Sequence, residues 1–172
     1  MQERFLEFLS DPKRESYLVV RDLVLQSEMY EPYSDEFKTA SELYDQEKWE
    51  EARQALQQSM PNLLLSPRAH HLLGFLFAKS ENHQAAEMEM YIAHACLIGI
   101  ESTGDGSPES PYLVLRTTDE YDLLEHLDKE RKTQFLLNLG DRHLDLLQCK
   151  DGSEIHFDIT APYTQMSKSF ER

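Results

Sequence analysis

A self-match at a spacing of 34 residues is the feature that most constrains how this 172-residue chain can fold. Small and bulky residues recur at matching places in the two copies. The aligned pairs are Phe37 with His71, Ala40 with Gly74, Leu43 with Phe77, Trp49 with His83, Ala52 with Ala86 and Leu56 with Met90. Small residues at such places let two helices cross closely, and the bulky residues fill the groove between them. The spacing therefore predicts two tandem helical hairpins.

The helices can be placed from their apolar periodicity and from the prolines that interrupt it. The predicted helices of the two hairpins span residues 34–46, 48–60, 67–79 and 83–98, and two N-terminal helices precede them at 3–9 and 12–29. Two repeats rarely form a stable stack alone, because each exposes an apolar face. We therefore expect the N-terminal helices to cover one end of the array and the C-terminal part to cover the other.

A Gly-, Ser- and Pro-rich stretch, ESTGDGSPESP, marks the boundary between two parts of the chain. Beyond it, the patterns predict a strand at 112–116, a helix at 118–128 and three antiparallel strands within 133–160. Thr117 and Glu120 have the spacing of a capping box at the start of that helix. The expected organisation is a helical region at 1–100, a connector at 101–111, a small α+β module at 112–165 packed on the helices, and a tail at 166–172.

Residues 33–98 resemble the tetratricopeptide-repeat (TPR) superfamily, although the usual Trp early in the first helix and the usual Gly before the second are missing. The order of a short TPR-like array, then GDGSPESPYLV, then FDIT is similar to an uncharacterised bacterial domain family. The resemblance implies an α+β fold. In it, a TPR-like helical array of two N-terminal helices plus two hairpins is capped by a small antiparallel sheet with one helix. It implies no established chemistry.

The composition is acidic, with 32 Asp and Glu against 17 Lys and Arg and a formal net charge of −15. A nucleic-acid partner is not expected, because a phosphate backbone requires a basic surface. The charge either serves solubility alone or steers the protein toward a basic partner. There is no signal-peptide pattern and no apolar stretch long enough to span a membrane. We therefore expect no membrane partner. Because Cys96 and Cys149 are isolated in the sequence, we also expect the protein to be located in a reducing cytoplasm.

Ligands of TPR domains usually lie in a groove lined by the first helix of each hairpin. The resemblance places Phe37, Ser41, Tyr44, His71, Phe75 and Lys79 on that surface. Phe37, Ser41, His71 and Phe75 depart from the Lys and Asn clamp of chaperone-binding TPRs, so binding of chaperone tails is not expected. The aromatic residues either anchor a partner protein or pack beneath the N-terminal helices.

The helix at 118–128 carries a second set of candidates. Asp119 and Glu120 are explained by the helix dipole, whereas the other three acidic residues are either solvated or recognise a partner. The full set of candidate protein-binding residues is Phe37, Tyr44, His71, Phe75, Asp122, Glu125 and Asp128.

Candidate chemistry is sparse in this sequence. His70, His71, His83 and His94 gather around the second hairpin, but the spacing does not supply the three or four close ligands of a zinc site. The run Asp141-Arg142-His143 falls at a hairpin without a nucleophile motif or cofactor fingerprint. We expect no catalytic residues, no metal and no cofactor.

The sequence favours a non-enzymatic protein-binding module: an acidic inhibitor, or immunity protein, that neutralises a bacterial toxin by occluding it. The alternative is a TPR-like scaffold or adaptor in a larger protein assembly. In both cases the expected partner is another protein of basic character. An edge strand of the C-terminal meander could also add to the sheet of a partner protein or to that of a second copy of the chain, but the sequence does not say which strand forms that edge.

Overall fold

The computed structural model describes residues 1–170 as an α+β fold with a small four-stranded sheet. Its elements, in order, are α1 (Gln2–Ser10), α2 (Arg14–Leu25), α3 (Glu36–Asp45), α4 (Trp49–Gln58), α5 (Met60–Leu63), α6 (Pro67–Lys79), α7 (His83–Glu101), β1 (Tyr112–Leu113), α8 (Thr117–His126), β2 (Arg131–Leu139), β3 (Arg142–Cys149), β4 (Glu154–Asp158) and α9 (Thr160–Phe170). No helix in this part of the chain is both long enough and apolar enough to cross a membrane.

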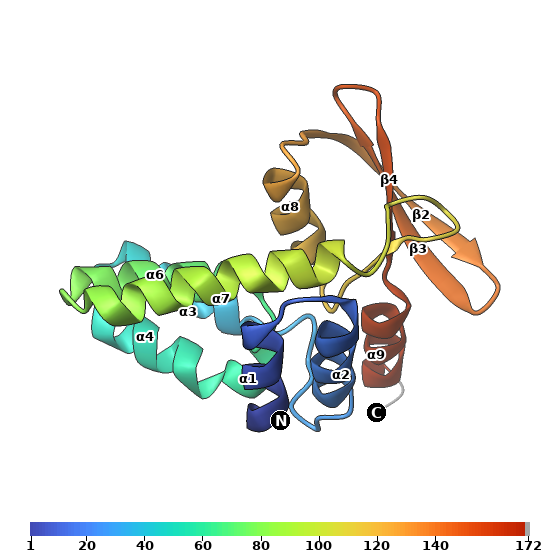
Figure 1. Cartoon of the computed structure of the whole chain (residues 1–172). Helices are drawn as coiled ribbons and strands as arrows, with labels where there is room; N and C mark the ends of the chain where they lie inside the picture. Colours follow the sequence, from blue (N-terminus) through green and yellow to red (C-terminus); the bar gives the residue numbers. More distant parts are fainter. Residues whose placement is uncertain (171–172) are drawn as a thin grey trace.

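The molecule has two parts that share α7 (Figure 1). We call α3, α4, α6 and the first half of α7 the arm. The body consists of α1, α2, the second half of α7, α8, α9 and the sheet. Each part has its own cluster of buried apolar side chains.

The arm contains the two helical hairpins at the predicted places, α3 with α4 and α6 with α7. Ala40 and Ala52 are fully buried in its core. A Cβ atom on Gly74 would lie 3.2 Å from the Met90 side chain and 3.3 Å from the carbonyl oxygen of Ala86. The aligned small residues therefore lie at close helix contacts, as the sequence predicts.

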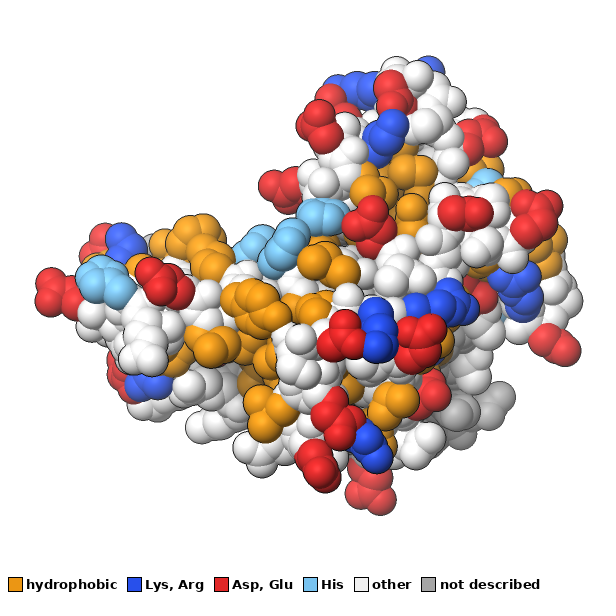
Figure 2. Space-filling view, in the orientation of Figure 1, with side chains coloured by type: hydrophobic (Ala, Val, Ile, Leu, Met, Phe, Trp, Pro, Cys, Tyr) orange, Lys and Arg blue, Asp and Glu red, His pale blue; other side chains and the backbone are white. Residues whose placement is uncertain are grey.

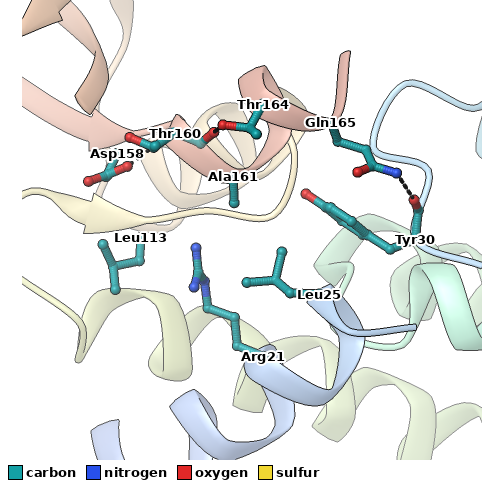
Figure 3. A pocket seen from close by; sticks show the side chains of 9 residues that line it. All are labelled: Arg21, Leu25, Tyr30, Leu113, Asp158, Thr160, Ala161, Thr164 and Gln165. Carbon is teal, nitrogen blue, oxygen red and sulfur yellow. Dashed lines mark hydrogen bonds between the residues drawn. The ribbon is translucent and has the colours of Figure 1, made fainter. Parts of the chain in front are cut away.

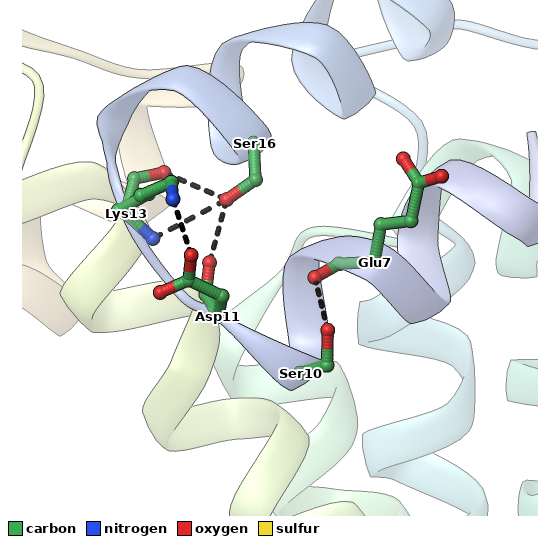
Figure 4. Close-up of polar contacts among 5 residues, drawn as sticks. All are labelled: Glu7, Ser10, Asp11, Lys13 and Ser16. Carbon is green, nitrogen blue, oxygen red and sulfur yellow. Dashed lines mark hydrogen bonds and ion pairs between the residues drawn. The ribbon is translucent and has the colours of Figure 1, made fainter.

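The two N-terminal helices meet at a hydrogen-bonded corner (Figure 4). Ser10 ends α1 by donating its hydroxyl to the carbonyl of Glu7 (2.8 Å). Ser16 donates its hydroxyl to the carbonyl of Asp11 (2.8 Å) and accepts the backbone N–H of Lys13 (3.3 Å). The ion pair between Lys13 and Asp11 closes the corner, so α1 stops where the sequence predicts, before Pro12.

α1 packs on α2, and α2 packs on the second half of α7, the half that also contacts β1 of the sheet. Tyr17 of α2 and Phe157 of β4 are both fully buried in the body cluster. The Tyr17 ring lies against Gly99, where a Cβ atom would be 2.3 Å from the ring. The expectation that these helices and the C-terminal module cover opposite ends of the array is therefore wrong. The reason is that α7 continues to Glu101, and its apolar second half packs against both.

The sheet has the strand order β1-β4-β3-β2 and is mixed, which corrects the expected antiparallel sheet. β2, β3 and β4 form the predicted antiparallel meander, but β1 pairs with β4 in parallel. The chain leaves β1, forms α8 and the meander, and returns beside β1, so the last strand runs in the same direction as the first. β1 is also shorter than the expected strand at 112–116, because Leu115 and Arg116 donate their backbone N–H groups to Asp119 at the start of α8.

A second helix in the C-terminal module, α9, also corrects the sequence analysis. The sequence patterns predict a tail at 166–172, but α9 continues into this segment and ends at Phe170. Residues 171–172 of the predicted tail lie outside the described range. Pro162 argues against a helix by pattern, but it falls in the first turn of α9, where its missing N–H has no intrahelical partner to lose.

Candidate functional site

An open groove lies where α8 of the body faces α6 and α7 of the arm. Its volume is about 230 Å³, and we call it the histidine groove. Its lining residues are Pro67, His71, His94, Leu97, Asp122, Glu125 and His126. Figure 2 shows histidine side chains gathered in this hollow between the arm and the upper lobe of the body. The consecutive helices α6 and α7 and the later helix α8 thus bring imidazoles and carboxylates together.

An ion pair between Arg68 and Asp122 connects the two walls of the groove. The guanidinium of Arg68 on α6 donates to both carboxylate oxygens of Asp122 at 2.7–3.0 Å and to the Thr118 carbonyl at 3.0 Å. Burial alone would lower the pKa of Arg68, but the hydrogen bond and the charge of Asp122 outweigh it and raise the pKa. The Arg68 side chain is 27% exposed and that of Asp122 14%, so the pair is partly shielded from solvent and helps hold α8 in place.

Histidine contacts continue along the groove toward the end of α7. The rings of His94 and His126 meet edge to face, with centroids 5.6 Å apart. The Nε2 atom of His126 lies 3.4 Å from a carboxylate oxygen of Glu101. Glu101 therefore adds a third carboxylate beside the two that line the groove.

The structure brings three of the seven sequence-predicted residues together in this groove: His71, Asp122 and Glu125. His71 and Glu125 are exposed, and Asp122 is half-buried. Phe75 lies one helical turn beyond His71 on α6 and is 52% exposed. These four residues form a contiguous candidate surface drawn from both predicted sets.

The remaining three predicted residues lie elsewhere. Phe37 and Tyr44 are half-buried and pack against the arm core of α3, α4 and α6, and the Arg68 guanidinium lies 5.6 Å from the centroid of the Phe37 ring. Asp128 is exposed just beyond α8 with a φ of 54°, and it does not line the groove.

Of the four histidines around the second hairpin, His70 is buried and is held by two polar contacts. It is 3% exposed, and its Nδ1 and Nε2 atoms lie 2.6 Å from a Glu89 carboxylate oxygen and 2.9 Å from the Leu64 carbonyl oxygen. His143 of the hairpin stacks on Tyr163 with ring centroids 3.9 Å apart. Within the part of the chain that the structure describes, no group of three or more His, Cys, Asp or Glu has the arrangement of a metal site.

The other face of α8 carries buried carboxyls. Asp119 caps the helix by accepting the backbone N–H groups of Leu115 (3.1 Å) and Arg116 (2.9 Å), so the predicted capping role of Glu120 is wrong. Glu120 is fully buried and faces Asp145. Burial, the charge of Asp145 and the hydrogen bond between these two carboxyls raise the pKa of Glu120 to about 10.

Gln134 joins the buried carboxyl pair by donating to Asp145 at 2.7 Å and to Glu120 at 3.3 Å. Paired carboxyls can act as a general acid and base where substrate reaches them. Glu120 is 0% exposed and Asp145 only 5%, so burial makes this pair a poor candidate for chemistry on a substrate.

A second cavity of about 430 Å³ lies between α2 and the start of α9 (Figure 3). The guanidinium of Arg21 points into it and donates to the Val114 carbonyl at 3.4 Å. Asp158 lines the same cavity, accepts the backbone N–H of Thr160 at 2.9 Å and pairs with Arg142 at 3.5 Å. Asp158 is thus paired and lies beside the Arg21 charge, so this cavity offers a basic partner no unpaired carboxylate and is a weaker candidate than the histidine groove, where Glu125 is unpaired.

Sequence reasoning missed His94 and His126 as neighbours of Asp122 and Glu125. The sequence pattern offers His94 only as a possible metal ligand and gives His126 no role. The spacing of Asp122, Glu125 and His126 on one helix face is a usable signal, because residues three and four apart share a face. The approach of α7 to that face depends on tertiary packing and has no local signature.

Comparison of the chain with models of known protein families, with curated proteins and with solved structures finds no match. The resemblance to TPR repeats and to a bacterial domain family thus stays a prediction, and the site rests on its own geometry.

Proposed function

We propose that this protein is a non-enzymatic protein-binding module. More narrowly, we propose an acidic inhibitor of the immunity-protein kind, which neutralises a basic bacterial toxin by occluding it. The observation that carries the proposal is the histidine groove, where carboxylates of α8 face an open, concave surface of α6 and α7. Because Asp122 is paired with Arg68, the free negative charge of the groove is the Glu125 carboxylate, which favours a protruding group of the opposite sign.

The groove suits a single Lys or Arg side chain of a partner. Glu125 is exposed and, among the described interactions, has no ion pair or side-chain hydrogen bond, so its carboxylate is available. Pro67 and Leu97 offer apolar contact for the aliphatic stem of such a side chain. The volume of about 230 Å³ lies below the roughly 300–1,000 Å³ of small-molecule pockets, which favours a side chain of a protein over a metabolite.

The surroundings of the groove support the same proposal. Phe75 is 52% exposed one turn from His71, where an aromatic ring can anchor an interface. The net charge of −15 would speed association with a basic partner, and added salt would slow it. An adaptor in a larger assembly would use the same groove, but it would leave its partner active. Inhibition of the partner therefore distinguishes the two functions.

The test begins with affinity capture from native lysate at low and high salt, followed by purification of any basic partner retained only at low salt. Binding of that partner is then compared for the wild type, Glu125→Gln and Glu125→Lys. We expect Glu125→Lys to weaken binding by about tenfold or more, because it places a positive charge where the partner's cation would lie. The partner's own activity should fall when wild-type protein is added.

Asp128→Asn is the matched control for Glu125→Gln. Both changes remove one exposed carboxylate at the same end of α8, and Asn tolerates the positive φ of residue 128. The groove is excluded as the binding surface if the two variants bind the partner equally well. The inhibitor function fails if a partner bound through the groove keeps full activity.

A further inference from the structure

β2 forms the open edge of the sheet. The strand order β1-β4-β3-β2 leaves β1 and β2 at the two edges. β1 has only two residues, and the connector extends that side, because His156 of β4 donates its backbone N–H to the Gly106 carbonyl at 2.8 Å. β2 is nine residues long and forms a hairpin with β3 that projects away from the arm (Figure 1). It is therefore the edge to which a further strand can pair.

The pairing of β3 with its two neighbours determines which backbone N–H and C=O groups of β2 face the open edge. Ile159 donates its N–H to the His143 carbonyl at 2.9 Å, so His143 and every second residue after it on β3 bond toward β4. The residues between them bond toward β2, where their partners include Phe135 and Leu137. Backbone groups of the alternate β2 residues then point outward. Those residues are Gln134, Leu136 and Asn138.

The same strand exposes a concentration of apolar side chains. Phe135 is 48% exposed, Leu136 46% and Leu139 54%. Natural edge strands are usually protected by Pro, by Lys or by a bulge. β2 has its bulge between Arg131 and Thr133, at one end, and the segment from Thr133 to Leu139 is regular.

We propose that β2 pairs antiparallel with β2 of a second copy of this chain, with the twofold axis at Leu136. In this register Leu136 faces Leu136 of the second copy, and Phe135 faces Leu137. Gln134 faces Asn138 and Thr133 faces Leu139 of the second copy, so the apolar matches are those at the centre of the ladder, Leu136 with Leu136 and Phe135 with Leu137. The outward-facing residues of the two copies then pair with each other, as an antiparallel ladder requires.

The apolar contacts favour this register over one centred on Phe135. That register would place Leu136 opposite Gln134 and Leu137 opposite Thr133, so it would lose the Leu136 pair and both contacts of Phe135 with Leu137. The contact lies on β2, outside the histidine groove, and does not depend on the proposed function.

The first experiment measures the molar mass of the purified chain by light scattering at about 100 µM, since an interface of one strand pair is small and dissociates on dilution. We expect a dimer, and a larger dimer fraction at higher salt, because salt screens the repulsion between two copies of charge −15. Leu136→Lys should give a monomer, because two ammonium groups would meet on the axis. Leu6→Lys, at a side chain 59% exposed on α1, is the control that should stay dimeric.

The second experiment tests the register by disulfide formation. Leu136→Cys should cross-link to its own copy under mild oxidation, since directly paired residues have the Cα separation that a disulfide needs. Phe135→Cys is equally exposed, faces Leu137 of the second copy, and should cross-link far more slowly. The native Cys96 and Cys149 are buried. Equal cross-linking of the two variants would overturn the register, and a monomeric wild type without cross-linked Leu136→Cys would overturn the dimer.

Discussion

The arm and the body differ in what fills their interiors. The arm core consists of apolar side chains from helices that are close in sequence, such as Ala52, Leu56 and Leu73. The body combines its apolar cluster with buried charged side chains, among them Arg116 and Glu120. An apolar interior accepts many packings of similar quality, whereas a buried charge needs its partners in place. The difference suggests that the body, more than the arm, depends on specific polar contacts.

Arg116 joins distant parts of the chain within the body. It donates to the backbone and side-chain oxygens of Asn62, which follows the first hairpin. Asn62 in turn donates to the Glu31 carbonyl at 3.1 Å, and the Tyr30 hydroxyl donates to the Leu115 carbonyl at 2.6 Å. Three segments far apart in the sequence are thus held through one polar cluster.

Replacement of Arg116 by Ala should have the largest effect on stability. It removes the Arg116 donor from both oxygens of Asn62, of which Oδ1 keeps only the backbone N–H of Glu31, and it removes the positive charge near the buried Asp119. Loss of one partner from a buried polar cluster costs about 3–5 kcal/mol, and we expect urea denaturation to show a loss of that size in the free energy of unfolding.

Arg53→Ala is the corresponding change in the arm. Arg53 pairs with Glu50, whose side chain is 60% exposed, and lies over the Phe77 ring. Arg53→Ala should lower the free energy of unfolding several times less than Arg116→Ala does, because a solvent-exposed ion pair contributes little to stability. Similar losses for the two variants would contradict the view that buried polar contacts are what distinguish the body.

Two glycines test the packing of the two parts, with a smaller expected effect. Gly99→Ala puts a Cβ atom 2.3 Å from the fully buried Tyr17 ring, and we expect a loss of about 2–3 kcal/mol from overpacking. Gly74→Ala puts a Cβ atom 3.2 Å from the flexible Met90 side chain and 3.3 Å from the Ala86 carbonyl oxygen, both milder contacts than that at Gly99. There the gain in helix propensity, about 0.5–1 kcal/mol, offsets the crowding, so stability should change by less than about 1 kcal/mol. Thermal unfolding of both variants would measure the difference.

A destabilisation by Gly74→Ala as large as that by Gly99→Ala would mean that the arm is packed as tightly as the body. The comparison between the two parts would then rest on polar contacts alone.

The same contrast explains which parts could be predicted from the sequence. Helical periodicity and the 34-residue spacing are local signals, and they placed α3, α4, α6 and α7 within a few residues. The parallel pairing of β1 with β4 joins residues more than 40 positions apart, and no local pattern encodes it. The acidic sequence around Glu120 predicts only a helix-dipole role for it, while its burial depends on contact with the sheet. The groove likewise depends on tertiary packing, because it combines predicted residues of α6 and α8 with His94 of α7.

Glu120→Gln should produce a smaller, pH-dependent gain in stability. Glu120 keeps its proton in the folded state up to about pH 10, whereas in the unfolded chain it loses the proton above about pH 4.5. The unfolded state therefore binds fewer protons in this window, and the wild type loses stability as the pH rises through it. Gln mimics the protonated acid, because its amide can donate to Asp145 and accept from Gln134. We expect the variant to be about 1–2 kcal/mol more stable than wild type at pH 8, with a smaller difference at pH 5.

Glu130→Gln is the control for this prediction. Glu130 lies in the same module, but its side chain is 71% exposed and pairs with Lys150 at the surface. Urea denaturation at pH 5, 6.5 and 8 should show a gap between Glu120→Gln and wild type that widens with pH, while Glu130→Gln follows the wild type. A gap that stays constant or narrows with pH would show that Glu120 is not protonated in the folded body. The buried carboxyl pair would then need a cation or water to accommodate its charge, since two ionised carboxylates in contact repel each other strongly.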